Sequence, residues 1–409
     1  MENKIPAFTP CDIVLPKCDD FSRWAVIACD QHTSDTAYWE EVEKTVGGAP
    51  SAYNMILPEA YLGSEKEALH KAKIPCQMKA VYENGSVVYS NSFVLVERTL
   101  PGGAVRYGLM GAVDLENYDF TGKKSVIRPT EDTVADRLPP RVAVRRTAKF
   151  EMPHVMLFID DSGRLFELAG SVSRGSKVLY DFDLMLGGGH VKGTLIDGEA
   201  LEKVSALISA IESEHTERGE MCYGVGDGNH SLAAAKSLWE EKKAAGAPLD
   251  DPARYALVEL VSIDDDAIVF EPIFRLVTGV DTAHFMRKIQ NDLFVTCQNC
   301  SYKTVDLICG GAALSAKLPV PDGQLTVGVL QDFIDSYIEE FGGECDYIHD
   351  EETLVSLASK EGSVGILFDG MAKSELFPYV SAFGPLPRKT FSMGSAATKR
   401  YYLEMRKIK

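Results

Sequence analysis

The chain has 409 residues, 45% of them hydrophobic, and a formal net charge of −18 at pH 7. These values are typical of a soluble globular protein with two or three domains, and the acidic balance argues against a general nucleic-acid binder. The apolar runs are too short for a membrane span, and the N-terminus lacks the basic start and apolar run of a secretory signal. We therefore expect a cytoplasmic protein with a small anionic ligand, and with neither nucleic acid nor membrane as a partner.

Residues 1–125 are expected to form an N-terminal α+β region. Helices are predicted at residues 36–46 and 64–73, where helix-forming residues follow capping residues. Residues 87–97 have the composition of a strand, and residues 106–114 are its predicted partner.

A polar cluster precedes the first predicted helix. Ser34 or Asp35 is sufficient to cap that helix, so capping leaves Asp30, Gln31 and His32 unexplained. We treat these three residues as secondary candidates for a functional site.

The central region, residues 126–280, combines both kinds of secondary structure. The predicted elements are strands at 141–146 and 154–160, a helix at 198–214, and strands at 255–263 and 267–270. In the first strand, alternation places Arg141 and Arg145 on one face, where two guanidinium groups could converge on one anion. The order of strand, glycine turn, helix and strand indicates a mixed α/β fold.

A proline-rich segment at residues 128–141 is dense in charge. Between residues 123 and 149, eight basic side chains occur with three acidic ones. Proline reduces the entropy lost when a segment becomes ordered around a ligand. Arg128, Arg137 and Arg141 are therefore candidates for a bidentate grip on phosphate, and Glu131 for binding a metal or accepting a proton. The alternative is a surface loop with mutually satisfied ion pairs.

The most informative motif is Tyr-Gly-Val-Gly-Asp-Gly-Asn-His-Ser, from Tyr223 to Ser231, which precedes an alanine-rich stretch. The glycines allow a tight turn, and the stretch after them favours a helix. The start of such a helix presents unpaired N–H groups and the positive end of the helix dipole, which together hold an anion. The candidate ligand-binding residues of this motif are Gly226, Gly228, Asn229 and Ser231.

Asp227 and His230 add acid–base groups to the same motif. A carboxylate and the side chain that titrates nearest neutrality suit proton transfer, so both are candidate catalytic residues, together with Glu131. A simple capped turn is the alternative. It explains the glycines, but it does not explain why four polar side chains occupy the five positions from Asp227 to Ser231.

Residues 281–409 are expected to form a C-terminal α/β region with a basic tail. We predict a helix at 330–341 and a strand at 365–368. From Arg388 to the C-terminus, seven basic residues occur with a single acidic one. Arg388 and Lys389 stand next to hydroxyl residues and a glycine, a combination that suits phosphate binding. A solvated basic terminus is the alternative.

Nine cysteines are scattered along the chain, and their odd number favours reduced thiols. Cys297 and Cys300 form one isolated C-x-x-C pair. A structural zinc site normally has a second pair or two histidines at matching spacing, so zinc or redox function is disfavoured here.

Several motifs together resemble the DUF1015 family, which was catalogued without an assigned function. They are Arg128–Arg137, Glu151-Met152-Pro153-His154, Asp227–Ser231, Phe270-Glu271-Pro272-Ile273-Phe274-Arg275 and Pro387–Gly394. The resemblance runs through nearly the whole chain in order. It adds Arg275 as a candidate ligand-binding cation and Glu271 as a secondary candidate.

In that family the glycine motif is usually Asp-Gly-His-His-Arg, which is similar to the phosphate-binding motif of the ParB and sulfiredoxin superfamily. The resemblance therefore implies a ParB/sulfiredoxin-like core and a link to kinases that phosphorylate free serine. This chain differs at Asn229 and Ser231, which replace the first His and the Arg, and at Phe274, where a His is common. The missing positive charge would have to come from Arg128, Arg141, Arg275 or the basic tail.

These features predict a phosphate- or nucleotide-binding enzyme that transfers a phosphoryl group to a small hydroxylated metabolite such as free serine, with ATP, ADP or pyrophosphate as donor. Mg²⁺ bound by Asp227 or Glu131 is the expected metal. The alternatives are a non-catalytic sensor of a nucleotide or acidic metabolite, and a metal-dependent hydrolase. The phosphate hypothesis requires Asp227 and His230 to face Glu131 and the arginines around it.

Overall fold

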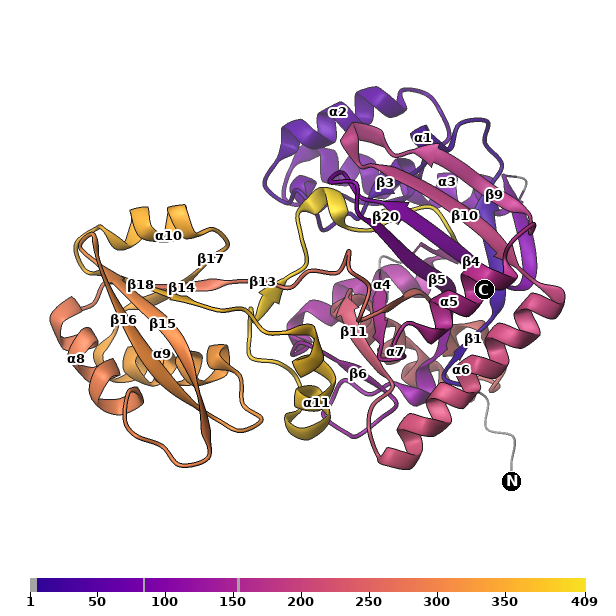
Figure 1. The fold of residues 1–409 in the computed structure, drawn as a ribbon. Helices are drawn as coiled ribbons and strands as arrows, with labels where there is room; N and C mark the ends of the chain where they lie inside the picture. Colours follow the sequence, from indigo (N-terminus) through magenta and orange to yellow (C-terminus); the bar gives the residue numbers. More distant parts are fainter. Residues whose placement is uncertain (1–5, 84, 153–154) are drawn as a thin grey trace. The chain divides into compact units, whose positions relative to one another are not determined.

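The computed structural model in Figure 1 describes residues 6–83, 85–152 and 155–409. These residues form two compact units. The first comprises the chain up to Ile268 together with Ser395–Lys409, and the second comprises Val269–Gly394. The predicted boundary at residue 125 lies inside the first unit, and the end of the basic tail returns to that unit. Both units combine helices with sheets, which confirms a mixed α/β fold class.

Ten strands of the described residues form one mixed sheet in the first unit. Eight of them follow the order β6-β11-β8-β12-β5-β4-β10-β9, while β1 pairs with β5 and β2 pairs with β4. The strands are β1 (Phe8–Thr9), β2 (Cys11–Pro16), β4 (Ser86–Thr99), β5 (Val105–Asp114), β6 (Ile127–Pro129), β8 (Met156–Ile159), β9 (Val178–Asp183), β10 (His190–Ile196), β11 (Tyr223–Asp227) and β12 (Tyr255–Ser262). β6 runs parallel to β11, and β8 runs parallel to β12. The antiparallel pairing of β4 with β5 confirms the strand pair predicted at residues 87–97 and 106–114.

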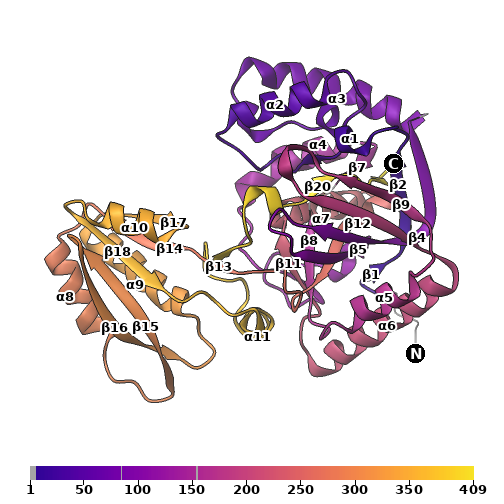
Figure 2. The ribbon, with the colours of Figure 1, turned by 45° about the horizontal axis from the view of Figure 1, so that its top comes forward.

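Both faces of this sheet are buried, because successive strand residues alternate between two apolar clusters. Val94 and Val96 on β4 belong to the cluster that contains residues of α1, α2 and α3, whereas Phe93 and Leu95 belong to the cluster of α5, α6 and α7. The helices are α1 (Phe21–Trp24), α2 (Thr36–Val46), α3 (Glu65–Glu83), α5 (Arg164–Val172), α6 (Gly198–Arg218) and α7 (Asn229–Ala244). Figure 2 shows α2 and α3 on one side of the sheet and α5 and α6 on the other.

Most of the helices follow the sequence predictions. α2 has the predicted bounds, and the Asp35 side chain caps it by accepting a hydrogen bond from the Tyr38 N–H. The helix predicted at 64–73 begins at Glu65 and continues through Pro75 to Glu83. In the part of the chain that the structure describes, we find no helix with the length and apolar character of a membrane span.

The strand predicted at residues 141–146 is wrong, because these residues belong to helix α4 (Leu138–Thr147). Prolines occupy the first turn of α4, where their fixed φ suits a helix and their missing N–H groups have no partner to lose. Leu138 and Val142, four residues apart, pack together against α7. Helical spacing therefore accounts for the apolar residues of this segment.

Two other strand predictions need comment. Residues 267–270 form no strand: Ala267 ends the turn that follows β12, and residues 268–270 have no regular secondary structure. The strand predicted at 154–160 corresponds to β8, while Pro153 and His154 lie outside the described residues.

The C-terminal tail is an integral part of the first unit. β20 (Tyr401–Tyr402) pairs with β3 (Val26–Ile27), and β21 (Arg406–Lys407) pairs with β7 (Phe150–Glu151). Arg400, directly before β20, is buried. The alternative of a solvated basic terminus is therefore wrong for this part of the chain.

Two buried arginines of the sheet hold the tail backbone. Arg98 on β4 and Arg106 on β5 stand directly opposite each other in the sheet register. Their guanidinium groups donate hydrogen bonds to the carbonyl oxygens of Ala397 and Thr398, at 3.1 and 3.3 Å. Two like charges at opposed positions are unfavourable by themselves, so the tail carbonyls supply part of the compensation.

Buried ion pairs fix the next part of the tail. Arg400 binds the Glu259 carboxylate at 2.5 Å and also pairs with Glu404. Six residues later, Arg406 binds Glu151 at 2.5 Å. All five side chains are nearly inaccessible to solvent, and removing one partner of such a pair leaves an uncompensated charge in the interior.

The second unit contains a five-stranded antiparallel sheet in the order β16-β15-β18-β14-β17, and a separate pairing of β13 with β19. Phe274 and Leu276 of β14 pack against α10, whereas Arg275 between them binds Gln331 of α9, as strand alternation requires. The elements are β13 (Glu271–Pro272), β14 (Phe274–Thr278), α8 (Thr282–Leu293), β15 (Cys300–Cys309), β16 (Ala312–Pro321), α9 (Thr326–Phe341), β17 (Glu344–Ile348), α10 (Glu351–Ala358), β18 (Ser363–Phe368), α11 (Lys373–Phe383) and β19 (Phe391–Ser392). α9 and β18 contain the predicted helix and strand of this region.

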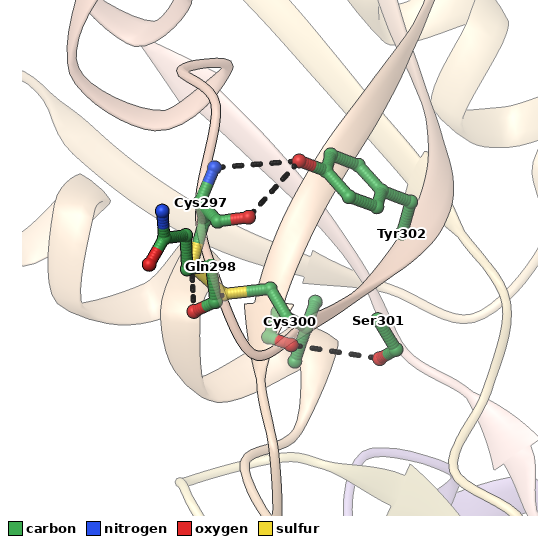
Figure 3. Close-up of a disulfide and its surroundings, with 6 residues drawn as sticks. Cys297, Gln298, Cys300, Ser301 and Tyr302 are labelled. Atoms are coloured by element: carbon green, nitrogen blue, oxygen red, sulfur yellow. Dashed lines mark hydrogen bonds between the residues drawn. A yellow bond between two sulfur atoms is a disulfide. The ribbon is translucent and has the colours of Figure 1, made fainter.

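Cys297 and Cys300 form a disulfide at the start of β15, as Figure 3 shows. The Tyr302 hydroxyl accepts a hydrogen bond from the Cys297 N–H at 3.3 Å and donates one to the Cys297 carbonyl at 3.4 Å. The expectation of reduced thiols is therefore wrong for this pair.

Replacing Arg400 with Met tests the role of the buried charges. This change leaves Glu259 and Glu404 without their shared partner, and we expect it to lower the free energy of unfolding of the first unit by about 3–5 kcal/mol. All three tryptophans, Trp24, Trp39 and Trp239, lie in the first unit, so urea unfolding followed by tryptophan fluorescence reports on that unit alone.

The control is Lys203→Met, which removes an exposed ion pair with Glu199. We expect this control to cost less than about 1 kcal/mol. Equal losses in the two variants would contradict a structural role for the buried charges.

Candidate functional site

The turn before α7 is built around two glycines with different requirements. Gly228 has a φ of 77°, in the left-handed region that favours glycine. A Cβ at Gly226 would overlap the ring of Phe158 on β8. Close packing and backbone conformation therefore explain these two glycines, as the capped-turn alternative supposed.

Capping does not explain the polar groups that follow. No side chain caps α7, and the Leu232 N–H donates to the Gly228 carbonyl at 3.0 Å. Among the described residues, no acceptor binds the backbone N–H groups of Asn229, His230 and Ser231. Unpaired N–H groups at the positive end of a helix dipole are an arrangement that favours an anion.

The segment after β6 lies beside this turn. β6 and β11 run parallel, with Arg128 paired to Gly224 in the register. The Thr130 hydroxyl donates to the Val225 carbonyl at 2.6 Å, and the Val134 N–H donates to Nε2 of His230 at 3.2 Å. The two motifs singled out in the sequence are therefore in contact, although about 90 residues separate them along the chain.

Burial and two arginines determine the protonation state of His230. Burial lowers the pKa of His230, and the charges of Arg141 and Arg137 lower this pKa further. Both arginines come from the start of α4, which packs against α7. Because Nε2 accepts the bond from Val134, the neutral ring carries its proton on Nδ1. At neutral pH His230 is therefore a neutral hydrogen-bond donor.

Asp227 has two partners at the start of the helix. Its Oδ1 accepts from the Gly228 N–H at 2.8 Å, and its Oδ2 lies 3.5 Å from the ammonium group of Lys399. Lys399 is one of the basic-tail cations that the sequence suggests as a source of positive charge. The tail that the buried arginines hold in place brings this lysine to the turn.

A second carboxylate joins the site through Arg141. The Arg141 guanidinium binds Glu59 at 3.1 Å, and the Glu59 N–H donates to the Cys29 carbonyl at 2.8 Å. Burial raises the pKa of the Cys29 thiol to about 12, and the charge of neighbouring Asp30 adds to this effect. α4 therefore connects the α7 turn with the segment that carries Asp30. Nothing in the local sequence singles out Glu59.

The other two polar residues of that segment have local partners. The Gln31 side chain donates to Oδ1 of Asp30 at 3.2 Å. The ring of His32 stacks on Tyr38, with centroids 3.7 Å apart, and lies 3.7 Å from the Asp35 carboxylate. Gln31 and His32 therefore have local partners at the start of α2.

Arg128, Glu131 and Arg145 have different environments. Arg128 is buried, its Nε donates to the Ser125 carbonyl at 3.1 Å, and burial lowers its pKa. Glu131 is exposed just beyond β6. Arg145 is committed to Glu151, at 2.6 Å, so it and Arg141 bind different carboxylates instead of one anion.

The remaining predicted residues lie in the second unit. Arg275 is fully buried, and it donates to the side chain of Gln331 and to the carbonyls of Ile273, Arg388 and Lys389. The Arg388 side chain pairs with Asp335. Glu271 is exposed in β13. Arg275 and Arg388 therefore have partners within their own unit.

The described residues contain no group of three or more His, Cys, Asp or Glu side chains placed to hold a metal. Mg²⁺ does not require such a group when phosphate oxygens and water complete its octahedral shell. A single carboxylate such as Asp227 fits that kind of site.

Replacing Gly226 with Ala separates packing from ligand binding. The added methyl group meets the Phe158 ring, so we expect a loss of about 1–3 kcal/mol in the free energy of unfolding, measured by tryptophan fluorescence. Gly170→Ala is the control, because a Cβ there meets nothing within 4 Å in helix α5. We expect this control to stabilise the chain by up to about 1 kcal/mol. A neutral G226A variant would contradict the packing explanation.

The protonation state of His230 can be measured by NMR titration of its ring. Arg141→Met removes a positive charge that disfavours the imidazolium, so we expect the pKa of His230 to rise in this variant. Arg146→Met is the matched control, since Arg146 is exposed on the same helix and pairs with Glu241. An unchanged pKa in R141M would show that the arginine does not act on this ring.

Comparison with solved structures finds only distant similarity. A free serine kinase in complex with AMP is 12% identical, over 73% of this chain and 91% of that chain, with a TM-score of 0.37. SbnI from Staphylococcus aureus, with a C-terminal truncation, is 12% identical over 70% and 83%, with a TM-score of 0.35. A conserved hypothetical protein from Pyrococcus furiosus is 11% identical over 73% and 94%, with a TM-score of 0.33. Similarity at this level assigns no activity.

A search of curated proteins finds no significant match. By contrast, the model of a protein family of unknown function, DUF1015, matches residues 10–406. This match covers nearly the whole chain, in agreement with the motifs identified in the sequence. The chain belongs to the DUF1015 family.

Proposed function

We propose that the chain binds a phosphate group of a nucleotide or of pyrophosphate at the start of α7 and transfers a phosphoryl group to a small hydroxylated metabolite such as free serine. The carrying observation is the set of three N–H groups, from Asn229, His230 and Ser231, for which the described residues provide no acceptor. An anion with several oxygens satisfies such a set at once, whereas a capping side chain satisfies one or two donors.

The cations around the turn suit a ligand with more than one negative charge. Lys399 lies beside Asp227, and Arg137 and Arg141 are close enough to His230 to lower its pKa. Phosphoryl transfer spreads charge over the oxygens of the transferred group, and its catalysis depends on positioning and on electrostatic stabilisation. This chemistry requires no covalent intermediate on the protein.

The hydrogen bonds divide the roles of His230 and the carboxylates. A neutral His230 with its proton on Nδ1 can donate to a phosphate oxygen, so we assign it to orienting phosphate. A carboxylate, either Asp227 or Glu131, then takes the proton from the hydroxyl group of the metabolite. Mg²⁺ bound by Asp227 would neutralise phosphate charge when present.

A non-catalytic sensor of a nucleotide or acidic metabolite is the second candidate. The same N–H groups and cations would serve it, because binding needs no proton acceptor. A hydrolase that uses Zn²⁺ is less favoured, since a catalytic Zn²⁺ takes three protein ligands and the described residues offer no such group.

³¹P NMR with ATP, ADP and pyrophosphate as donors and a panel of hydroxylated acceptors, free serine included, tests this proposal. We expect a new phosphomonoester resonance with the unmodified chain, and a loss of about 10²-fold or more in its rate of formation with Asp227→Asn. Asp197→Asn is the matched control, because Asp197 is an exposed residue at the start of another helix, α6, and makes no side-chain cap.

No transfer from any donor, combined with binding of ADP, would favour the sensor. Failure of every donor to bind would contradict the proposed phosphate site. Equal loss of transfer in D227N and D197N would contradict the role of Asp227.

A further inference from the structure

Lys399 has a fixed backbone and a side chain that can exchange its partner. On one side of it, the carbonyl of Thr398 is held by Arg106. On the other side, Arg400 is buried in its ion pairs, and its carbonyl accepts from the Ala28 N–H at 3.0 Å. Any response of this part of the tail to a ligand is therefore confined to the lysine side chain.

The ion pair between Lys399 and Asp227 is long. The ammonium and the carboxylate oxygen are 3.5 Å apart, and both side chains are about four-fifths buried. A charge-assisted hydrogen bond usually measures about 2.7–2.9 Å. At the other end of α7, Lys242 binds Asp251 at 2.6 Å. The distance between the charged atoms is thus longer in the ion pair at the start of α7 than in the ion pair at its end.

The same turn contains a second unsatisfied group. Asn229 is 6% exposed, and among the described residues its side-chain Oδ1 has no donor, although its Nδ2 donates back to the Val225 carbonyl. A buried acceptor without a donor is costly unless a ligand hydroxyl, a water or a metal ion satisfies it. Asn229 therefore indicates a donor or a cation at this turn, such as a ligand hydroxyl, since a phosphate oxygen is itself an acceptor and does not satisfy Oδ1.

We propose that Lys399 is a phosphate-contacting residue, and that phosphate replaces Asp227 as the partner of its ammonium group. This inference rests on the proposed function. It identifies Lys399 as the source of the positive charge that is missing at position 231, where Ser231 replaces the arginine of the family motif. A doubly charged phosphate attracts the ammonium more strongly than one carboxylate does. The exchange leaves Asp227 free to accept a proton or to bind a divalent cation. In the ligand-free chain, the Asp227 carboxylate thus occupies the position beside the Lys399 ammonium group that phosphate takes when it binds.

This exchange predicts opposite effects for the two partners when no divalent cation is present. Lys399→Met removes the cation but keeps the aliphatic stem, so phosphate binding weakens. Asp227→Asn removes a competing negative charge, and the new amide oxygen can still accept from the Gly228 N–H, so phosphate binding tightens. If Lys399 and Asp227 had only structural roles, both substitutions would weaken phosphate binding or leave it unaffected.

Isothermal titration calorimetry with pyrophosphate and with ADP, in buffer containing EDTA, measures these effects on the full chain. We expect the dissociation constant to rise at least tenfold in K399M and to fall at least twofold in D227N. Lys242→Met is the matched control, because it removes the ion pair at the opposite end of the same helix. We expect it to change the dissociation constant less than twofold. Lys399→Gln replaces K399M if that variant does not fold.

The outcomes separate this inference from the proposed function. If the unmodified chain binds neither pyrophosphate nor ADP, the proposed function fails and the inference fails with it. If it binds, but K399M and K399Q bind within twofold of it, Lys399 is not a phosphate ligand and the inference alone is overturned. Weaker binding in D227N under EDTA also overturns the exchange.

Discussion

The site of this DUF1015 protein depends on buried ion pairs between its C-terminal tail and its main sheet. Arg400 pairs with Glu259 and Glu404, and Arg98 and Arg106 hold the tail carbonyls on the preceding residues. Buried ion pairs contribute less to net stability than their Coulomb attraction suggests, because desolvation opposes them. Here the ion pairs matter because they fix the position of the tail, which places Lys399 beside the glycine turn before α7.

The second constraint is the packing of α4 on α7. Apolar contacts between these helices place Arg137 and Arg141 near His230, and a backbone N–H near its Nε2. The ring is therefore neutral at neutral pH, and its proton is on the other nitrogen. Of the two roles that the sequence leaves open for His230, orienting phosphate and assisting proton transfer, a neutral ring that donates a hydrogen bond is better suited to the first. Tertiary packing, more than the motif itself, decides this role.

The sequence correctly predicted the elements whose formation depends on residues within a single short segment. The bounds of α2, its Asp35 cap and the helix after the glycine turn follow from local propensities and capping. The strand predicted at 141–146 failed because alternation of apolar and charged residues over a few positions also fits a helix whose apolar residues are four apart. Glu59 was missed, and Lys399 was suggested only as one of several cations of the basic tail, because a single sequence does not reveal contacts between distant segments. The tail did carry one hint: its charges alternate with Tyr, Leu and Met, which is unusual for a solvated terminus.

The central claim is that the N–H groups at the start of α7 hold a phosphate. A crystal structure of the chain with ADP tests it most directly. We predict a phosphate of ADP within hydrogen-bonding distance of the N–H groups of Asn229, His230 and Ser231, with Nδ1 of His230 directed at one of its oxygens. A nucleotide bound elsewhere on the chain, with this turn occupied by water alone, would contradict the claim.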